Sequence, residues 1–176
     1  VVDAPTAIAT HLNSILYQAA PELLGHDEAQ QLLDKTAERS PKLIENLVPN
    51  KLSLASLTRV LQNLLRDGVP IRDMRTILEV LNEEGAKIQD PDELTALVRP
   101  KLGRMIVQSL VEMTEEMPVM TLDPQLEQIL HNAVQQSHQT KTLTIDPELA
   151  ENLFKSMRHE SQKIEEQGKP AILVVS

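Results

Sequence analysis

Leucine and other aliphatic residues recur every three or four positions along residues 53–85. This spacing places them on one face of an α-helix, because side chains three and four residues apart lie on the same side. Ser53 and Asp73 precede the two leucine-bearing segments, and short polar side chains of this kind cap helix N-termini. Gly68 and Gly85 follow them as helix stops. The segment is therefore predicted to form two amphipathic helices joined by a short turn, as a helical hairpin or helix-turn-helix.

The same periodicity occurs on both sides of this segment, so the first two thirds of the chain are predicted to be entirely helical. Further helices are predicted to begin at Asp3, Asp27, Ser40 and Asp90. Pro21 is expected to interrupt the first of them, and Pro100 is expected to kink or break the last. Proline has this effect because it lacks the backbone N–H and clashes with the preceding turn.

The last third of the chain mixes strand and helix patterns. Apolar alternation over 118–122 and an apolar run over 171–175 each predict a strand. Between them we predict, in order, a helix from Asp123, a polar loop over 135–140, a short strand or loop over 142–145, and a helix from Asp146. The predicted fold class is α+β and predominantly α, with a helical subdomain followed by a small, incomplete α/β subdomain.

Composition excludes several classes of function. The 176 residues include 17 Lys and Arg against 26 Asp and Glu, which gives a net charge of −9 at pH 7, whereas domains that bind nucleic acid are basic. Tyr17 and Phe154 are the only aromatic residues, too few to stack bases or to form an aromatic cage. The absence of cysteine excludes disulfides, thiolate metal sites and thiol nucleophiles. No apolar run is long enough to span a bilayer.

The sequence predicts no catalytic residue, no metal site and no cofactor. The histidines fall outside any H-E-x-x-H motif, and surface or helix-end positions explain them better. The isolated glycines form no phosphate-binding loop. Acidic residues occur as adjacent pairs, which point to different sides of a helix, whereas acid–base catalysis needs two carboxyl groups that converge. We therefore expect a protein that is not an enzyme.

The densest group of charged residues surrounds the glycine turn between the two leucine-rich helices. Its members are Arg66, Asp67, Arg72, Asp73 and Arg75. One interpretation is DNA contact by a helix-turn-helix, which the net charge and the interleaved acids oppose. The favoured interpretation is a local ion-pair network that orients the two helices or gives specificity toward a neighbouring subunit.

The residues around this cluster resemble a known family. Residues 60–79 read V-L-Q-N-L-L-R-D-G-V-P-I-R-D-M-R-T-I-L-E. This run is similar to the cytoplasmic domain of the export-gate proteins of type III secretion, which serve flagella and injectisomes. Further matches occur in V-V-D-A at 1–4, I-A-T-H at 8–11, E-A-Q-Q-L-L-D at 28–34, D-P-D-E-L-T at 90–95 and L-G-R at 102–104. The resemblance is strong up to residue ~110 and looser beyond it, and its details favour the flagellar branch.

The resemblance implies a division into subdomains. Residues 1–24 correspond to the last helix of a first, thioredoxin-like subdomain, residues 25–105 to a helical third subdomain, and residues 106–176 to part of an α/β fourth subdomain. In the family, a membrane-embedded half precedes these subdomains. The chain is therefore expected to be a soluble fragment of a longer protein that lies at the cytoplasmic face of the bacterial inner membrane.

The resemblance also implies partners. The family forms a nine-membered ring that docks chaperone–substrate complexes and soluble export components, with no cofactor and no nucleic acid. The neighbourhood of Thr10 maps onto the chaperone-docking site. The candidate subunit contacts are Leu57, Arg66, Arg72 and Arg75, since exposed arginines beside leucines suit interfaces. Two alternatives stay open: these four residues only stabilise the helix pair, or the chain is an acidic helical adaptor or helix-turn-helix regulator unrelated to secretion.

Overall fold

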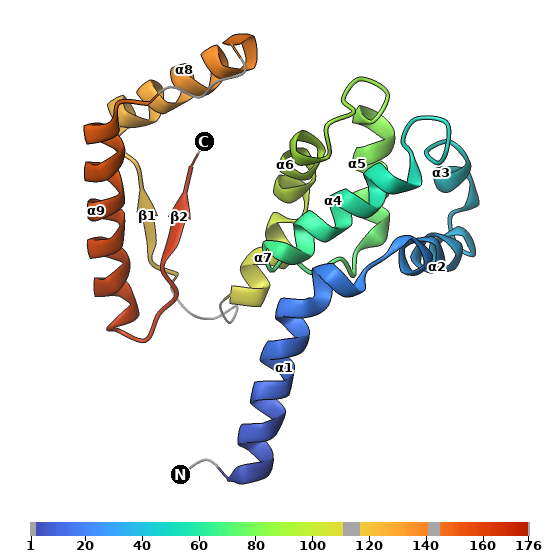
Figure 1. Ribbon diagram of the computed structural model, residues 1–176, viewed down its shortest axis with the longest axis horizontal. Coiled ribbons are helices and arrows are strands. Elements are labelled where there is room, and N and C mark those ends of the chain that lie inside the picture. The colour runs from blue at the N-terminus through green and yellow to red at the C-terminus, as the bar shows by residue number, and fades with distance from the viewer. Residues whose placement is uncertain (1–2, 111–116, 141–144, 176) are drawn as a thin grey trace. The chain divides into compact units, whose positions relative to one another are not determined.

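The computed structural model describes residues 3–110, 117–140 and 145–175, with side chains omitted over 136–140 (Figure 1). The chain divides into two compact units, Val1–Ser109 and Leu110–Ser176, and each is considered by itself. None of the described helices combines the length and the apolar character that crossing a membrane requires.

The described part of the first unit is built from helices. They are α1 (Ala4–Leu23), α2 (His26–Ala37), α3 (Pro41–Glu45), α4 (Leu54–Arg66), α5 (Met74–Glu84), α6 (Pro91–Lys101) and α7 (Gly103–Leu110), the last of which reaches the boundary of the unit. In Figure 1, α4 runs through the middle of this bundle. Helices α1, α2 and α6 pack against α4, and α6 also packs against α5.

The helix starts follow from capping side chains at the predicted positions. Ser53 Oγ accepts the N–H of Ser56 at 3.0 Å, and Asp73 Oδ1 accepts the N–H of Thr76 at 3.1 Å. Asp90 caps α6 in the same way. These oxygens satisfy amide groups that have no partner inside the helix. The predicted starts of α4, α5 and α6 are therefore confirmed.

The core of this unit is aliphatic. The predicted leucine stripe of α4 is confirmed, because Leu57, Leu61 and Leu64 are fully buried. They share one cluster with buried residues of the other helices, among them Leu33, Leu52, Ile77, Leu78, Leu81, Leu94 and Val98. The prediction of a simple two-helix hairpin is incomplete, since α6 packs against both α4 and α5 more extensively than these two pack against each other.

The two internal prolines behave differently. The prediction that Pro21 interrupts the first helix is wrong, because α1 continues through it to Leu23. Pro21 is buried at the end of α1, and the N-terminal two thirds of that helix are exposed. Burial of its ring offsets part of the cost of the lost hydrogen bond. Pro100 fits its prediction, since α6 ends at Lys101 and α7 begins at Gly103.

The second unit contains a parallel pair of short strands connected through two helices. Its elements are β1 (Val119–Thr121), α8 (Pro124–Thr140), α9 (Pro147–Glu165) and β2 (Ile172–Val174). Val119 pairs with Ile172 and Thr121 with Val174. The polar loop predicted over 135–140 is wrong, because α8 continues to Thr140. The strand or loop predicted over 142–145 lies outside the described residues except for its last position.

The second unit has little interior. Apolar side chains of β1, α8, α9 and β2, including Met120, Leu126, Leu153 and Leu173, surround a small hollow of about 190 Å³. No described residue of this unit is fully buried. Both aromatic residues of the chain are also exposed, Tyr17 on α1 by 79% and Phe154 on α9 by 66%. The predicted fold class, predominantly α with a small α/β part, is confirmed.

Candidate functional site: a cationic groove on the helical unit

Apart from Arg72, the charged residues around Gly68 bind partners outside their own cluster. Asp67 forms an ion pair with Arg99 of α6, and Arg75 forms one with Glu79 on its own helix. Arg66 Nη1 donates to Asn63 Oδ1 at 2.7 Å. The predicted network of mutual ion pairs is therefore wrong.

The geometry of the connection explains this outcome. Gly68 adopts a positive φ of 71° at the end of α4, and α5 begins only at Met74. The charges at the two helix ends are separated by this connection. Residues three or four positions away on the same helix are nearer partners, as the Arg75–Glu79 pair shows. Asp73 accepts from both Thr76 N–H and Thr76 Oγ1, so it serves as a helix cap.

Leu57 is not a surface residue. Its exposed fraction is 0%, and it belongs to the central apolar cluster. The prediction that Leu57 makes a subunit contact is therefore wrong, because a partner cannot touch it in this fold. The sequence pattern identifies α4 as amphipathic but does not show that three neighbouring helices cover its apolar face.

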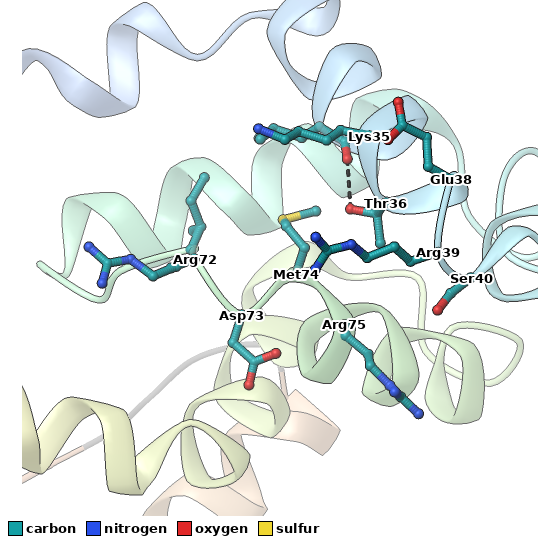
Figure 2. Close-up of a pocket in the computed structure, with 11 residues that line it drawn as sticks. Lys35, Thr36, Glu38, Arg39, Ser40, Arg72, Asp73, Met74 and Arg75 are labelled. Atoms are coloured by element: carbon teal, nitrogen blue, oxygen red, sulfur yellow. Dashed lines mark hydrogen bonds between the residues drawn. The ribbon is translucent and has the colours of Figure 1, made fainter.

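One hollow of the first unit is a groove of about 650 Å³ beside α2 and the start of α5. We call it the cationic groove. Its charged lining consists of Lys35, Glu38, Arg39, Arg72, Asp73 and Arg75. Its apolar lining consists of Leu32, Ile71 and Met74. Figure 2 shows Arg39 extending from the turn after α2 toward Met74, while Arg72 and Arg75 extend to different sides of that residue.

Two features keep the groove positive. Within the described part of the chain, Lys35, Arg39 and Arg72 form no ion pair. Arg75 is paired, and its hydrogen bond to Glu79, together with the charge of Glu79, raises the pKa of Arg75. The lining also carries four basic side chains against two acidic ones, Glu38 and Asp73, and the Asp73 carboxylate accepts from Thr76 Oγ1 at 2.7 Å. The arrangement suits recognition of carboxylate groups rather than chemistry on a substrate.

Sequence reasoning finds Arg72 and Arg75 but misses Lys35 and Arg39. Lys35 lies in the last turn of α2, whereas Arg39 lies in the turn that follows the end of this helix at Ala37. Their closeness along the chain is the local signal available in the sequence. The approach of the α2 end to the start of α5 is a tertiary contact, which spacing along the chain does not encode.

Comparison with known proteins identifies the family. Residues 1–176 match the FHIPEP family throughout. The chain belongs to this family. Among its relatives is the flagellar biosynthesis protein FlhA of Yersinia enterocolitica, 44% identical over 176 residues, which are 100% of this chain and 25% of the relative. FlhA of Salmonella typhimurium is 46% identical over 130 residues, which are 74% of this chain and 19% of the relative. The chain thus spans a quarter or less of the length of these relatives.

Three solved structures share the fold of this chain. The Shigella flexneri MxiA protein aligns with a TM-score of 0.77 at 23% identity, over 100% of this chain and 56% of that one. The Chlamydia pneumoniae CdsV protein, solved in complex with CdsO, gives 0.75 at 27% identity, over 89% and 46%. Nonameric EPEC SctV-C, solved by cryo-EM, gives 0.72 at 24% identity, over 96% and 57%.

These matches confirm the predicted resemblance to type III secretion export gates, with flagellar proteins among the relatives. The FHIPEP family is one of export gates and not of known enzymes, as predicted. An adaptor or regulator unrelated to secretion is therefore no longer a candidate.

Other predicted positions of this FHIPEP chain lie away from the groove. Thr10 is exposed on α1, whose N-terminal part carries the exposed side chains of Ile8 and Leu12.

The described residues contain no cluster of three side chains able to hold a metal ion. His131 contacts Gln135 on α8, and the side chain of His138 is outside the described residues.

Arg66 belongs to a polar network between α4 and α6. The amide of Asn63, 8% exposed, donates to Asp92 Oδ1 at 2.7 Å and accepts from Arg66 Nη1 at 2.7 Å. Thr95 Oγ1 lies 3.4 Å from the same amide nitrogen. This arrangement fixes the direction in which Arg66 leaves the helix and links the C-terminal end of α4 to the first turns of α6.

Replacing Asn63 by alanine is expected to lower the free energy of unfolding by about 1–3 kcal/mol, because Asp92 and Arg66 lose a buried partner. Chemical denaturation followed by circular dichroism measures this change. Asn46→Ala, at an exposed position beside α3, is the control and should change stability by less than about 0.5 kcal/mol. Equal stability of the two variants would show that the network contributes nothing.

Proposed function

We propose that this chain is part of a flagellar type III export gate and acts as a ring-forming docking platform for chaperone–substrate complexes. The observation that carries the proposal is the match along the whole chain to FlhA of Yersinia enterocolitica at 44% identity. On this proposal the chain works at the cytoplasmic face of the bacterial inner membrane, and membrane attachment belongs to other parts of the protein. Its role is recognition, without a cofactor and without nucleic acid.

Two structural relatives support the kinds of partner. SctV-C is nonameric, which supports contacts between copies of this chain in a nine-membered ring. CdsV forms a complex with CdsO, which supports binding of a second protein to this type of domain. Thr10 on the exposed part of α1 is the proposed contribution of this chain to chaperone docking.

The proposed division of the chain into three segments rests on the family resemblance. We assign residues 1–24 to the last helix of a first subdomain, residues 25–105 to a helical third subdomain, and residues 106–176 to part of a fourth. The boundary between the compact units, after Ser109, lies close to the second of these divisions. The packing of α1 against α4 joins the first segment to the second.

The proposed subunit contacts are Arg66, Arg72 and Arg75. All three are exposed, and Arg75 keeps 73% of its side chain in solvent. Arginine is enriched in interfaces, and its planar guanidinium group can donate two parallel hydrogen bonds to one carboxylate.

Charge reversal at Arg72 or Arg75 is expected to weaken ring assembly without unfolding the protein, since neither side chain is part of the core. Assembly of the full-length protein is measured by native mass spectrometry, and folding by circular dichroism. Arg59→Glu, which makes the same change at another exposed position on α4, is the control. Rings of wild-type stability in the Arg72→Glu and Arg75→Glu proteins would refute the assignment of these contacts.

A further inference from the structure

We infer that Gln62 of α4 is a positioning residue for chaperone docking. Its side chain fixes the angle at which α1 leaves the rest of the helical unit, and this angle sets where Thr10 is presented to a docking complex. The amide nitrogen of Gln62 donates to the carbonyl oxygen of Leu24, the residue that follows α1, at 2.8 Å. The inference rests on the proposed docking role of α1 and names a residue that controls it without touching the docked complex.

The helix that carries Thr10 is attached to the rest of its unit at one end. Residues 3–18 are exposed, whereas Pro21 and Leu24 are buried. Figure 1 shows α1 projecting from the bundle, with its C-terminal end beside α4, which is its main packing partner among the described helices. The contacts that decide the angle of α1 are therefore those made by its last turn and by the residue after it.

The hydrogen bond from Gln62 is the directional contact of this junction. Burial of Pro21 and Leu24 holds the end of α1 in place, but the hydrophobic effect has no preferred direction. A hydrogen bond weakens steeply when donor, hydrogen and acceptor depart from a line. Among the described residues, no other side-chain hydrogen bond joins residues 3–24 to α4. Removal of this one donor should therefore loosen the angle of α1 while the apolar contacts remain.

The helix that holds α1 is itself fixed within the unit. Asn63, the residue next to Gln62, donates to Asp92 of α6 at 2.7 Å and accepts from Arg66 at 2.7 Å. The same turn of α4 thus binds α6 through Asn63 and the end of α1 through Gln62. This turn connects the helix proposed to dock chaperones with the part of the chain proposed to contact other subunits.

The length of α1 amplifies a small change at the junction. Thr10 and Leu24 are about four helical turns apart along one continuous helix, or about 21 Å at 1.5 Å per residue. A change of about 10° in the angle of α1 therefore moves Thr10 by about 4 Å. A displacement of this size takes a side chain out of hydrogen-bond range of a bound partner. Docking should therefore depend on Gln62 although the two positions are far apart.

Two substitutions separate the hydrogen bond from the shape of the side chain. Gln62→Met keeps the length but has no donor, and Gln62→Lys is slightly longer and restores a donor. In the full-length protein, Gln62→Met is expected to weaken binding of a purified flagellar chaperone–substrate complex of the same organism at least about five-fold. Gln62→Lys should bind within about two-fold of wild type. Isothermal titration calorimetry measures both affinities.

A further variant tests the same donor by a different chemical change. Gln62→Glu has the shape of glutamine, but its carboxylate repels the carbonyl oxygen of Leu24 instead of donating to it. It should weaken docking at least as strongly as Gln62→Met does. This variant decides the question if the methionine protein does not fold, as judged by circular dichroism.

Pulsed electron paramagnetic resonance measures the angle of α1 without any docked partner. Spin labels are attached to cysteines introduced at Asn13 of α1 and Arg59 of α4, both exposed positions, after replacement of any other cysteine of the full-length protein by serine. Dilution with unlabelled copies restricts the measurement to distances within one copy. The distance distribution should shift or broaden in Gln62→Met and return to its wild-type form in Gln62→Lys. A role limited to fold stability would leave it unchanged.

The outcomes separate this inference from the proposed function. Wild-type protein that binds no chaperone–substrate complex would refute the proposed function, and this inference with it. If wild type binds, the inference alone is overturned by unchanged binding or an unchanged distance in Gln62→Met, or by failure of Gln62→Lys to restore them. Gln31→Met makes the same change at an exposed position of α2 and should alter neither measurement.

Discussion

Replacing Leu57 by alanine is expected to lower the free energy of unfolding by about 2–5 kcal/mol. The side chain is fully buried where α4 meets its neighbouring helices, so its removal leaves a cavity that the surrounding side chains fill only in part. Chemical denaturation of the variant and of wild type, followed by circular dichroism, measures the difference.

Leu23→Ala is the matched control for this prediction. Leu23 is the same residue type at the end of α1 but is 62% exposed, so its replacement should cost about 0.5 kcal/mol or less. A Leu57→Ala protein with wild-type stability and impaired ring assembly would place Leu57 in the subunit interface after all and contradict the packing described above.

Replacing Gly85 by alanine is expected to destabilise the first unit by about 1–3 kcal/mol. An added Cβ would lie 2.5 Å from the carbonyl oxygen of Leu81 and 2.9 Å from two side-chain carbons of Leu52. The φ of Gly85 is −64°, which any residue adopts, so the cost is one of space and not of backbone conformation. Thermal or chemical denaturation measures the loss.

Gly68 provides the comparison that separates these two causes. A Cβ there meets nothing within 4 Å, but φ is +71°, a region that costs an ordinary residue about 1–2 kcal/mol. Asparagine tolerates this region better than alanine, so Gly68→Asn should be more stable than Gly68→Ala. At Gly85, asparagine should be no better than alanine. If asparagine instead rescues both positions, the steric explanation at Gly85 is wrong.

Much of the helical unit follows from local sequence signals. Ser53, Asp73 and Asp90 start helices because their oxygens bind free amide groups, and the periodic leucines of α4 are buried as the pattern predicts. Pro21 shows the limit of this reasoning. A proline inside a helix costs a backbone hydrogen bond, which is why the sequence predicts an interruption there. The helix nevertheless continues through Pro21 because the residue is buried against the rest of the unit, and burial is a tertiary property.

The candidate site depends on tertiary structure to a greater extent. Arg72 and Arg75 stand out in the sequence because they closely follow a glycine turn, whereas Lys35 and Arg39 lie at and just after the end of a helix more than thirty residues earlier. The pairing of Asp67 with Arg99 likewise joins positions far apart in the chain. Charge clusters that are close in sequence therefore give a poor prediction of ion pairs, because side chains pair with whatever the packing of the helices brings near.

The placement of the two aromatic rings has a spectroscopic consequence. This chain has no tryptophan, and its single tyrosine is 79% exposed on α1, so the ultraviolet emission of these 176 residues arises outside the buried aliphatic cluster. Tyrosine fluorescence will therefore respond weakly to melting of the leucine cluster. It will respond strongly to any molecule that settles over α1, which makes Tyr17 a built-in optical reporter of docking on that helix.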